Sequence, residues 1–209
     1  MLVLGLDTCL ATCSVAVLED GAVRAFASQS MARGHQERLA PMAREVMATA
    51  GLGFDALDRI GVTVGPGSFT GLRVGVAFAK GLSLALDKPA VGIGTLEAMA
   101  AGIGGLIFPA IDARRGQLYL QAFEDGRALM APDALTAGDA AARIAELSQG
   151  RPFTLVGSGA HLLADVSANA RVVEAEGCDA RAVARLAAAR TPGPLKPLYL
   201  RAPDAKLPA

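Results

Sequence analysis

Residue types that commonly hold metals or form disulfides are scarce in this chain. Its 209 residues include two histidines, three cysteines and no tryptophan. An odd number of cysteines without regular spacing does not predict a disulfide framework. His35 is followed one helical turn later by Leu39 rather than by a second ligand, and His161 is remote. We therefore expect no metal site, and we interpret the cysteines as small buried hydrophobic residues rather than nucleophiles.

The chain also lacks net charge. Lys and Arg together number 20, as do Asp and Glu, so the formal net charge at pH 7 is zero. Proteins that bind nucleic acid on their own usually carry a basic excess that releases counterions from the phosphates. The balance argues against such a protein, although it leaves room for a local basic patch.

The sequence contains neither a recognisable secretion signal nor a long apolar run. No basic residues precede the first apolar stretch, and Asp7 interrupts it. We find no run of the roughly 18 apolar residues that a membrane helix needs. Hydrophobic residues make up 52% of the chain, enough for a packed core. The expected protein has no membrane contact and is cytoplasmic.

Apolar runs that alternate with turn residues predict an α/β fold. Strands are expected over 2–6, 13–18, 22–29, 60–64 and 89–93, and helices over about 35–50, 71–86 and 96–102. Pro41 should bend the first helix, and Thr95 should cap the third.

The pattern then restarts, which indicates an internal duplication. Asp7 precedes Glu19 by twelve residues, and Asp112 precedes Glu124 by the same spacing. A Val-Gly-X-Gly sequence follows a strand at 64–67 and again at 156–159. These repeats predict an N-terminal lobe over 1–105 and a shorter C-terminal lobe over 106–209. The second lobe should contain helices at about 138–148 and 179–190 and end in an extended Pro-rich tail from Thr191.

Hydroxyl residues surround Asp7 at the end of the first predicted strand. This arrangement resembles the first phosphate loop of the actin, Hsp70 and sugar-kinase fold, in which backbone N–H groups face phosphate. The candidate nucleotide-binding residues are Asp7, Thr8, Ser14, Asp112, Gly157 and Gly159. The same residue types also end strands and cap turns, and that alternative stays open.

The sequence GPGSFTG at 65–71 is the sharpest local signal. Ser68 or Thr70 can cap the helix that follows, whose N-terminus could hold an anion. The Gly-Lys-Ser/Thr ending of a Walker loop is missing. A tight corner between a strand and a helix explains the glycines equally well.

Several motifs together resemble the TsaB (YeaZ) family, a group of threonylcarbamoyl-transfer proteins once labelled glycoprotease-like. They are LDT at 6–8, CSVAV at 13–17, H-x-x-R-L-x-P-M at 35–42, GPGSFTGLRVG at 65–75, IGTLEAMA at 93–100, IDARRGQLY at 111–119 and YLR at 199–201. The likeness is dense over residues 1–125, becomes sparse beyond them, and returns near the closing YLR.

The resemblance implies a two-lobe duplicated actin/Hsp70-like (ribonuclease H-like) ATPase fold with a degenerate second lobe. It also implies a non-catalytic scaffold subunit, required for N6-threonylcarbamoyladenosine at position 37 of tRNAs that read codons beginning with A. The implied partners are the transferase TsaD and the ATPase TsaE, with tRNA contacted indirectly through the complex. Leu39 replaces the second histidine of the transferase's metal-binding His-x-x-x-His, and no catalytic residue is expected.

The family is also expected to dimerise with TsaD, and with itself when alone, through two helices of the first lobe. The helices at 35–50 and 71–86 are both broadly apolar, which fits either a core role or a four-helix interface. The candidate partner-binding residues are His35, Leu39, Met42, Val46, Leu72, Val76, Ala79 and Ser83. No tightly bound cofactor is expected, only weak ATP or ADP binding at the complex interface.

The sequence leaves two enzymatic alternatives open. One is an ATP-dependent phosphotransferase of the sugar-kinase type that uses Asp7 and Asp112 around Mg²⁺, although 209 residues leave little room for a substrate site. The other is a metalloprotease, which only the old family label suggests.

Overall fold

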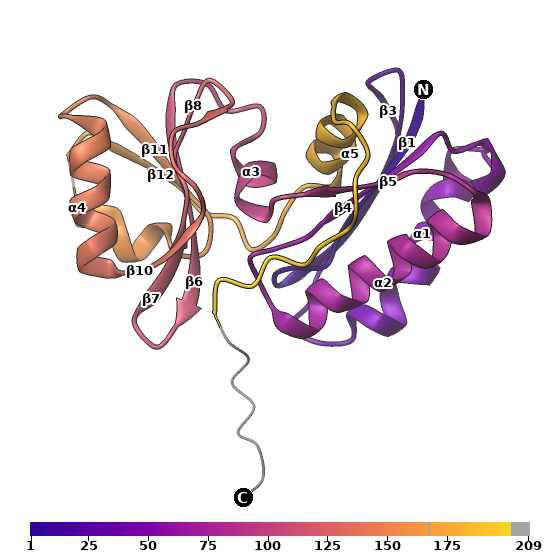
Figure 1. Ribbon diagram of the computed structural model, residues 1–209, viewed down its shortest axis with the longest axis horizontal. Coiled ribbons are helices and arrows are strands. Elements are labelled where there is room, and N and C mark those ends of the chain that lie inside the picture. The colour runs from indigo at the N-terminus through magenta and orange to yellow at the C-terminus, as the bar shows by residue number, and fades with distance from the viewer. Residues whose placement is uncertain (167, 202–209) are drawn as a thin grey trace, which may run out of the picture.

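The computed structural model describes residues 1–166 and 168–201, which form two lobes side by side (Figure 1). Each lobe contains one mixed β-sheet with helices against it. Residues 202–209, the end of the predicted Pro-rich tail, lie outside the described residues.

The first lobe is built on a five-stranded sheet in the order β3-β2-β1-β4-β5. Strands β1 to β3 are antiparallel, whereas β1, β4 and β5 are parallel. The elements are β1 (Leu2–Asp7), β2 (Thr12–Glu19), β3 (Ala22–Ser30), α1 (His35–Thr49), η1 (Phe54–Ala56), β4 (Arg59–Thr63), α2 (Phe69–Leu86) and β5 (Ala90–Ile93).

The second lobe repeats this strand order as β10-β7-β6-β11-β12, with a small hairpin of β8 and β9 beside β6. Its elements are β6 (Leu106–Arg114), β7 (Gln117–Leu120), β8 (Phe123–Glu124), β9 (Arg127–Ala128), β10 (Asp133–Thr136), α4 (Ala137–Ser148), β11 (Phe153–Val156), η2 (Ala160–Val166) and β12 (Ala170–Val173). The predicted duplication is therefore present in the topology.

The sequence echoes correspond to matching backbone turns. Asp20 and Gly21 have φ values of 48° and 83°, and Asp125 and Gly126 have values of 48° and 82°. Two consecutive positive φ angles form the turn that best matches the twist of a hairpin. The two lobes thus use the same acidic-Gly turn after the same number of residues.

One helix of the C-terminal half belongs to the first lobe. Helix α5 (Ala180–Ala189) packs on β1, β2 and β4, on the sheet face opposite α1 and α2 (Figure 1). The helix can lie this close to the sheet because the paired residues Gly5 and Gly61 have no side chains. A Cβ on Gly5 would lie 2.2 Å from the Ala180 carbonyl oxygen. The predicted second lobe of 106–209 is therefore wrong at its C-terminal end.

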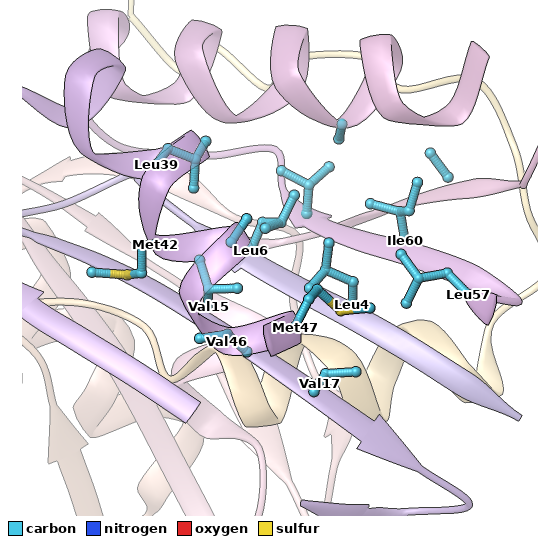
Figure 2. Packing of buried hydrophobic residues seen from close by; sticks show 14 of the residues in the cluster. Leu4, Leu6, Val15, Val17, Leu39, Met42, Val46, Met47, Leu57 and Ile60 are labelled. Atoms are coloured by element: carbon cyan, nitrogen blue, oxygen red, sulfur yellow. The ribbon is translucent and has the colours of Figure 1, made fainter. Parts of the chain in front are cut away.

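The main core lies between the first sheet and α1 with α2. In Figure 2, Leu39 and Met42 point from α1 toward the sheet, where Leu6 and Val15 lie. Pro41 is inside α1, as expected, at a half-buried position. Helix α2 begins two residues earlier than expected because Ser68 is its N-cap.

The cap predicted for the third helix is wrong. Gly94, not Thr95, is the N-cap of α3 (Thr95–Ala100), and it makes no side-chain cap hydrogen bond. The Thr95 hydroxyl is buried without a hydrogen-bond partner among the described residues.

Helix α2 is long and apolar, although Arg73 and Lys80 interrupt its apolar run. With 18 residues and a mean hydropathy of 1.3, it is long and apolar enough to cross a membrane by length and composition alone. Helices that cover a sheet pass the same test, and α2 places Leu72, Val76 and Ala79 in the core.

Candidate interlobe site and partner surface

A cavity of about 620 Å³ lies between the lobes. Its walls come from the loop at 66–69 before α2, from 111–114 at the end of β6, and from the C-terminal segment 198–201. His35 and His161 also line it. This volume is in the range of small-molecule sites.

Asp7 does not reach this cavity, because the chain encloses it completely. Its Oδ1 accepts hydrogen bonds from the Thr63 hydroxyl at 2.6 Å and from the Cys9 amide at 3.1 Å, and its Oδ2 accepts one from the Cys178 amide at 3.2 Å. Burial raises the pKa of Asp7, and these hydrogen bonds oppose the rise. Asp7 thus ties together β1, β4 and the start of α5.

Thr8 and Ser14 are likewise committed to the fold. The Thr8 hydroxyl donates to the Gly71 carbonyl at 2.7 Å, and the Ser14 hydroxyl donates to the Cys178 carbonyl at 2.8 Å. Both side chains are fully buried. All three of the candidates Asp7, Thr8 and Ser14 lie behind the cavity wall, so the structure does not place them where a ligand in the cavity would touch them.

The three candidate nucleotide-binding residues of the second lobe have two different roles. Asp112 lines the cavity, and its Oδ1 accepts from the Arg114 amide at 2.8 Å. Gly157 and Gly159 serve packing, since a Cβ would lie 2.4 Å from the Ala110 carbonyl oxygen at Gly157 and 2.6 Å from Leu118 Cδ2 at Gly159. Only Asp112 keeps a position from which it could face a ligand.

The GPGSFTG sequence forms a tight corner. A Cβ would lie 2.3 Å from the Cys9 carbonyl oxygen at Gly67 and 2.0 Å from that of Thr8 at Gly71, and the Gly65–Pro66 peptide is cis. The Ser68 amide donates to the Cys9 carbonyl at 2.7 Å. Close packing against residues 8–9 therefore accounts for the glycines, and anion binding at this helix start stays a prediction.

The histidine and cysteine chemistry agrees with a structural role. His35 Nε2 lies 3.1 Å from the Leu10 carbonyl oxygen, and Leu39 is in the core. Burial raises the pKa of Cys9 to about 12 and that of Cys13 to about 11, so neither thiol ionises readily at neutral pH. Within residues 1–166 and 168–201, no three His, Cys, Asp or Glu side chains gather as metal ligands would.

Most of the candidate partner-binding residues lie inside the molecule rather than on a surface. His35, Leu39, Met42, Val46, Leu72, Val76 and Ala79 are all buried. Ser83 is half-buried, and its hydroxyl donates to the Lys88 carbonyl at 2.6 Å. These residues form the inner faces of α1 and α2, so the apolar stripe that selected them marks the core.

The opposite face of α2 is the one open to solvent. We define the outer face of α2 by its exposed residues Arg73, Ala77, Lys80, Gly81, Leu84 and Ala85. Leu84 is 87% exposed, the highest value among the large hydrophobic residues of the described chain. The helix was identified correctly as broadly apolar, but its exposed residues could not be distinguished without knowing which side the sheet takes.

Sequence reasoning also missed the role of the C-terminal segment. Leu195 joins the core of the first lobe, and the Leu198 amide donates to the Val64 carbonyl at 2.7 Å. The segment 191–201 contains no strand. The closing YLR motif was the one signal that pointed here.

Comparison with known proteins agrees with this architecture. The family model "TsaD: tRNA N6-adenosine threonylcarbamoyltransferase" matches residues 26–156, more than half of the chain. The TsaB protein of Escherichia coli is 37% identical over 124 residues, which are 57% of this chain and 53% of that protein. The chain thus spans about half the length of this curated relative. The match to TsaB of Haemophilus influenzae likewise covers 51% of that protein.

Solved structures extend the likeness across both lobes. A Pseudomonas aeruginosa protein described as similar to the peptidase YeaZ aligns with a TM-score of 0.82 and 26% identity, over 96% of this chain and 99% of that one. An activator of 2-hydroxyisocaproyl-CoA dehydratase from Clostridium difficile, solved with bound ADPNP, aligns with a TM-score of 0.54 and 12% identity over 90% and 94%. The second likeness concerns the fold alone and agrees with the expected actin-like architecture. The chain therefore belongs to the TsaD-related family that includes the TsaB (YeaZ) proteins.

Proposed function

We propose that this chain is a non-catalytic scaffold subunit for the formation of N6-threonylcarbamoyladenosine at position 37 of tRNAs that read codons beginning with A. Its partners in this role are the transferase TsaD and the ATPase TsaE. Membership of the TsaD-related family and the names of the TsaB relatives support the pathway. The expected location is the cytoplasm, where tRNA is modified.

The observation that carries the non-catalytic role is the position of Leu39. The resemblance implies that it stands where the transferase has its second metal-binding histidine, and it packs in the core of the first lobe. A leucine offers no donor atom, and His35 is already within hydrogen-bonding distance of a backbone carbonyl. The catalytic metal of the complex then belongs to TsaD.

The outer face of α2 is the surface that we assign to TsaD. Its small residues Ala77, Gly81 and Ala85 let another helix approach closely, and Leu84 supplies an apolar anchor. The same face would support a homodimer when the chain is alone. A zero net charge suits a subunit that contacts tRNA indirectly, through its partners.

A phosphotransferase of the sugar-kinase type is less well supported. Such an enzyme needs Asp7 near Mg²⁺, yet both Asp7 oxygens accept hydrogen bonds from the chain itself. We accordingly expect no tight nucleotide binding to the isolated chain, and weak ATP or ADP binding only at the interface with TsaD. Calorimetry with ATP and Mg²⁺ tests this, and micromolar affinity for the isolated chain would revive the enzyme hypothesis.

The decisive experiment is reconstitution of tRNA modification with TsaD, TsaE, this chain and an activated threonylcarbamoyl donor, omitting one protein at a time. We expect no threonylcarbamoyl transfer by the chain alone and none by the other two without it. Transfer by the isolated chain would contradict the non-catalytic role. Full modification in its absence would contradict the scaffold role.

A pair of matched variants tests the assigned surface. Leu84→Glu places a charge on the outer face of α2, and Leu162→Glu places one on η2 of the second lobe, where Leu162 is 47% exposed. We expect only Leu84→Glu to abolish co-elution with TsaD, with little change in the melting temperature of either variant. Equal loss in both variants, or in neither, would remove the outer face of α2 as the TsaD surface.

A further inference from the structure

The C-terminal segment enters the interlobe region from the core of the first lobe. Leu195 is buried, and Leu198 is bonded to Val64 directly after β4. The Leu198 carbonyl lies against Gly65, where a Cβ would approach it to 2.6 Å. The first part of the segment is thus firmly fixed to the first lobe.

Tyr199 continues this attachment at the start of α2. Its ring centroid lies 5.2 Å from that of Phe69, and its hydroxyl accepts a hydrogen bond from Arg73 Nε at 3.1 Å. The Arg73 guanidinium also lies over the Phe69 ring at 3.7 Å from the centroid. These three residues form one stacked cluster, and Tyr199 remains 42% exposed at its edge.

Arg201 then reaches the other lobe. Its Nη1 donates to the carbonyl of Ala113 at 2.6 Å, within β6. Residues 198–201 all line the interlobe cavity. The segment therefore holds the two sides of the cavity mouth together by noncovalent contacts.

The connection between α3 and β6 permits movement. Gly102 and Gly105 have φ values of 81° and 79°, and a Cβ at either position would meet nothing within 4 Å. Loose glycines at the joins between rigid elements are suited to absorb changes in backbone angle. A buried cluster joins the lobes behind the cavity, with Leu96 and Met99 packed among residues such as Ile107, Ile111 and Val156, so opening of the cavity mouth would be a rotation about this cluster.

We propose that residues Leu198–Arg201 form a latch that keeps the lobes closed over the cavity, fixed to α2 through Tyr199 and to the second lobe through Arg201. Release of Arg201 from Ala113 opens the cavity while Leu198 stays bound to the first lobe. Because Arg73 also lies on the outer face of α2, the latch connects that surface to the cavity. The latch itself is independent of the function proposed above.

The test measures the separation of the lobes in the full-length chain. Spin labels are placed on Ala48→Cys in α1 and Ala145→Cys in α4, both exposed, whereas the three native cysteines are buried. We expect the Tyr199→Ala/Arg201→Gln variant to gain a population at longer distances.

Two comparisons make the result specific. Arg151→Gln removes an exposed ion pair with Glu124 inside the second lobe and should leave the distances unchanged. Arg201→Gln alone serves if the double variant does not fold, since it removes only side-chain contacts, and it should shift the distances in the same direction. Unchanged distances in the latch variants, or an equal shift in Arg151→Gln, would overturn the latch.

Discussion

The two lobes share a strand order but treat their corresponding acidic residues in opposite ways. Asp7 is enclosed at the end of β1 by three hydrogen-bond donors, whereas Asp112 lines the interlobe cavity with its side chain 27% exposed. The first lobe carries the 18-residue α2 at the point where the second has the short η2. The two lobes thus share a framework, but the acid of the first lobe is a structural anchor, and only the first lobe carries a long helix with an exposed face.

Replacing each acid by alanine tests most directly whether the two lobes use these residues differently. Asp7→Ala leaves the Thr63 hydroxyl and the amides of Cys9 and Cys178 without their acceptor in a buried site. We expect the free energy of unfolding to fall by about 3–5 kcal/mol, as for other buried charged acceptors. Urea denaturation followed by circular dichroism measures it.

Asp112→Ala is the matched control. It removes one hydrogen bond from the Arg114 amide and a 3.6 Å ion pair with an exposed guanidinium. The expected loss is about 1 kcal/mol. Equal losses in the two variants would show that the acids are not differently used.

The pH dependence of stability sharpens the same contrast. Burial raises the folded-state pKa of Asp7 above its ordinary value of 3.8, so the folded chain holds this proton more tightly than the unfolded chain does. Stability from this group is therefore greatest at low pH and declines as the pH rises from 3.8 through the folded-state pKa. The stability of the wild type minus that of Asp7→Asn should fall across this window, and a rising difference would mean that the hydrogen bonds outweigh burial.

A smaller effect is expected where α5 crosses the first sheet. Gly5→Ala would bring Cβ to 2.2 Å from the Ala180 carbonyl oxygen and 2.9 Å from the Ala184 nitrogen, so the helix backbone must shift. We expect destabilisation of about 2–3 kcal/mol in chemical denaturation. Gly5 lies two residues before Asp7, and the second lobe has Ala110 two residues before Asp112. The close approach of a helix backbone to the sheet at this position therefore distinguishes the first lobe from the second.

Gly104→Ala provides the control for this substitution. A Cβ there meets nothing within 4 Å. Its effect should stay within about 0.5 kcal/mol. If Gly5→Ala were equally mild, α5 would be free to move away from the sheet at little cost.

The framework could be predicted from the sequence because it rests on local signals. Apolar runs gave the strands, and the acidic-Gly turns at 19–21 and 124–126 revealed the duplication. The location of α5 could not be found this way, since an Ala-rich amphipathic helix fits either sheet. Only the pairing of Gly5 with Gly61, which is not visible along the chain, creates the shallow surface that receives it.

The site was harder to predict for a related reason. Asp7 at a strand end has the same sequence context whether it faces a ligand or the chain. The difference arises from Cys178, which is 171 residues away and brings the donor that closes the site. Likewise, the stripe through Val76 and Ala79 identifies a buried face, whereas the partner surface that we propose lies on the opposite side of the same helix.

The smallest expected effect concerns that opposite side. Gly81 is exposed in the middle of α2, and a Cβ there meets nothing within 4 Å. Gly81→Ala should therefore raise the free energy of unfolding by about 0.5–1 kcal/mol, because alanine loses less backbone entropy in a helix. If TsaD packs closely on the outer face of α2, the same methyl group should weaken the complex, so stability and affinity would change in opposite directions. Denaturation and titration calorimetry with TsaD measure the two quantities, and unchanged affinity would place the contact elsewhere on the helix.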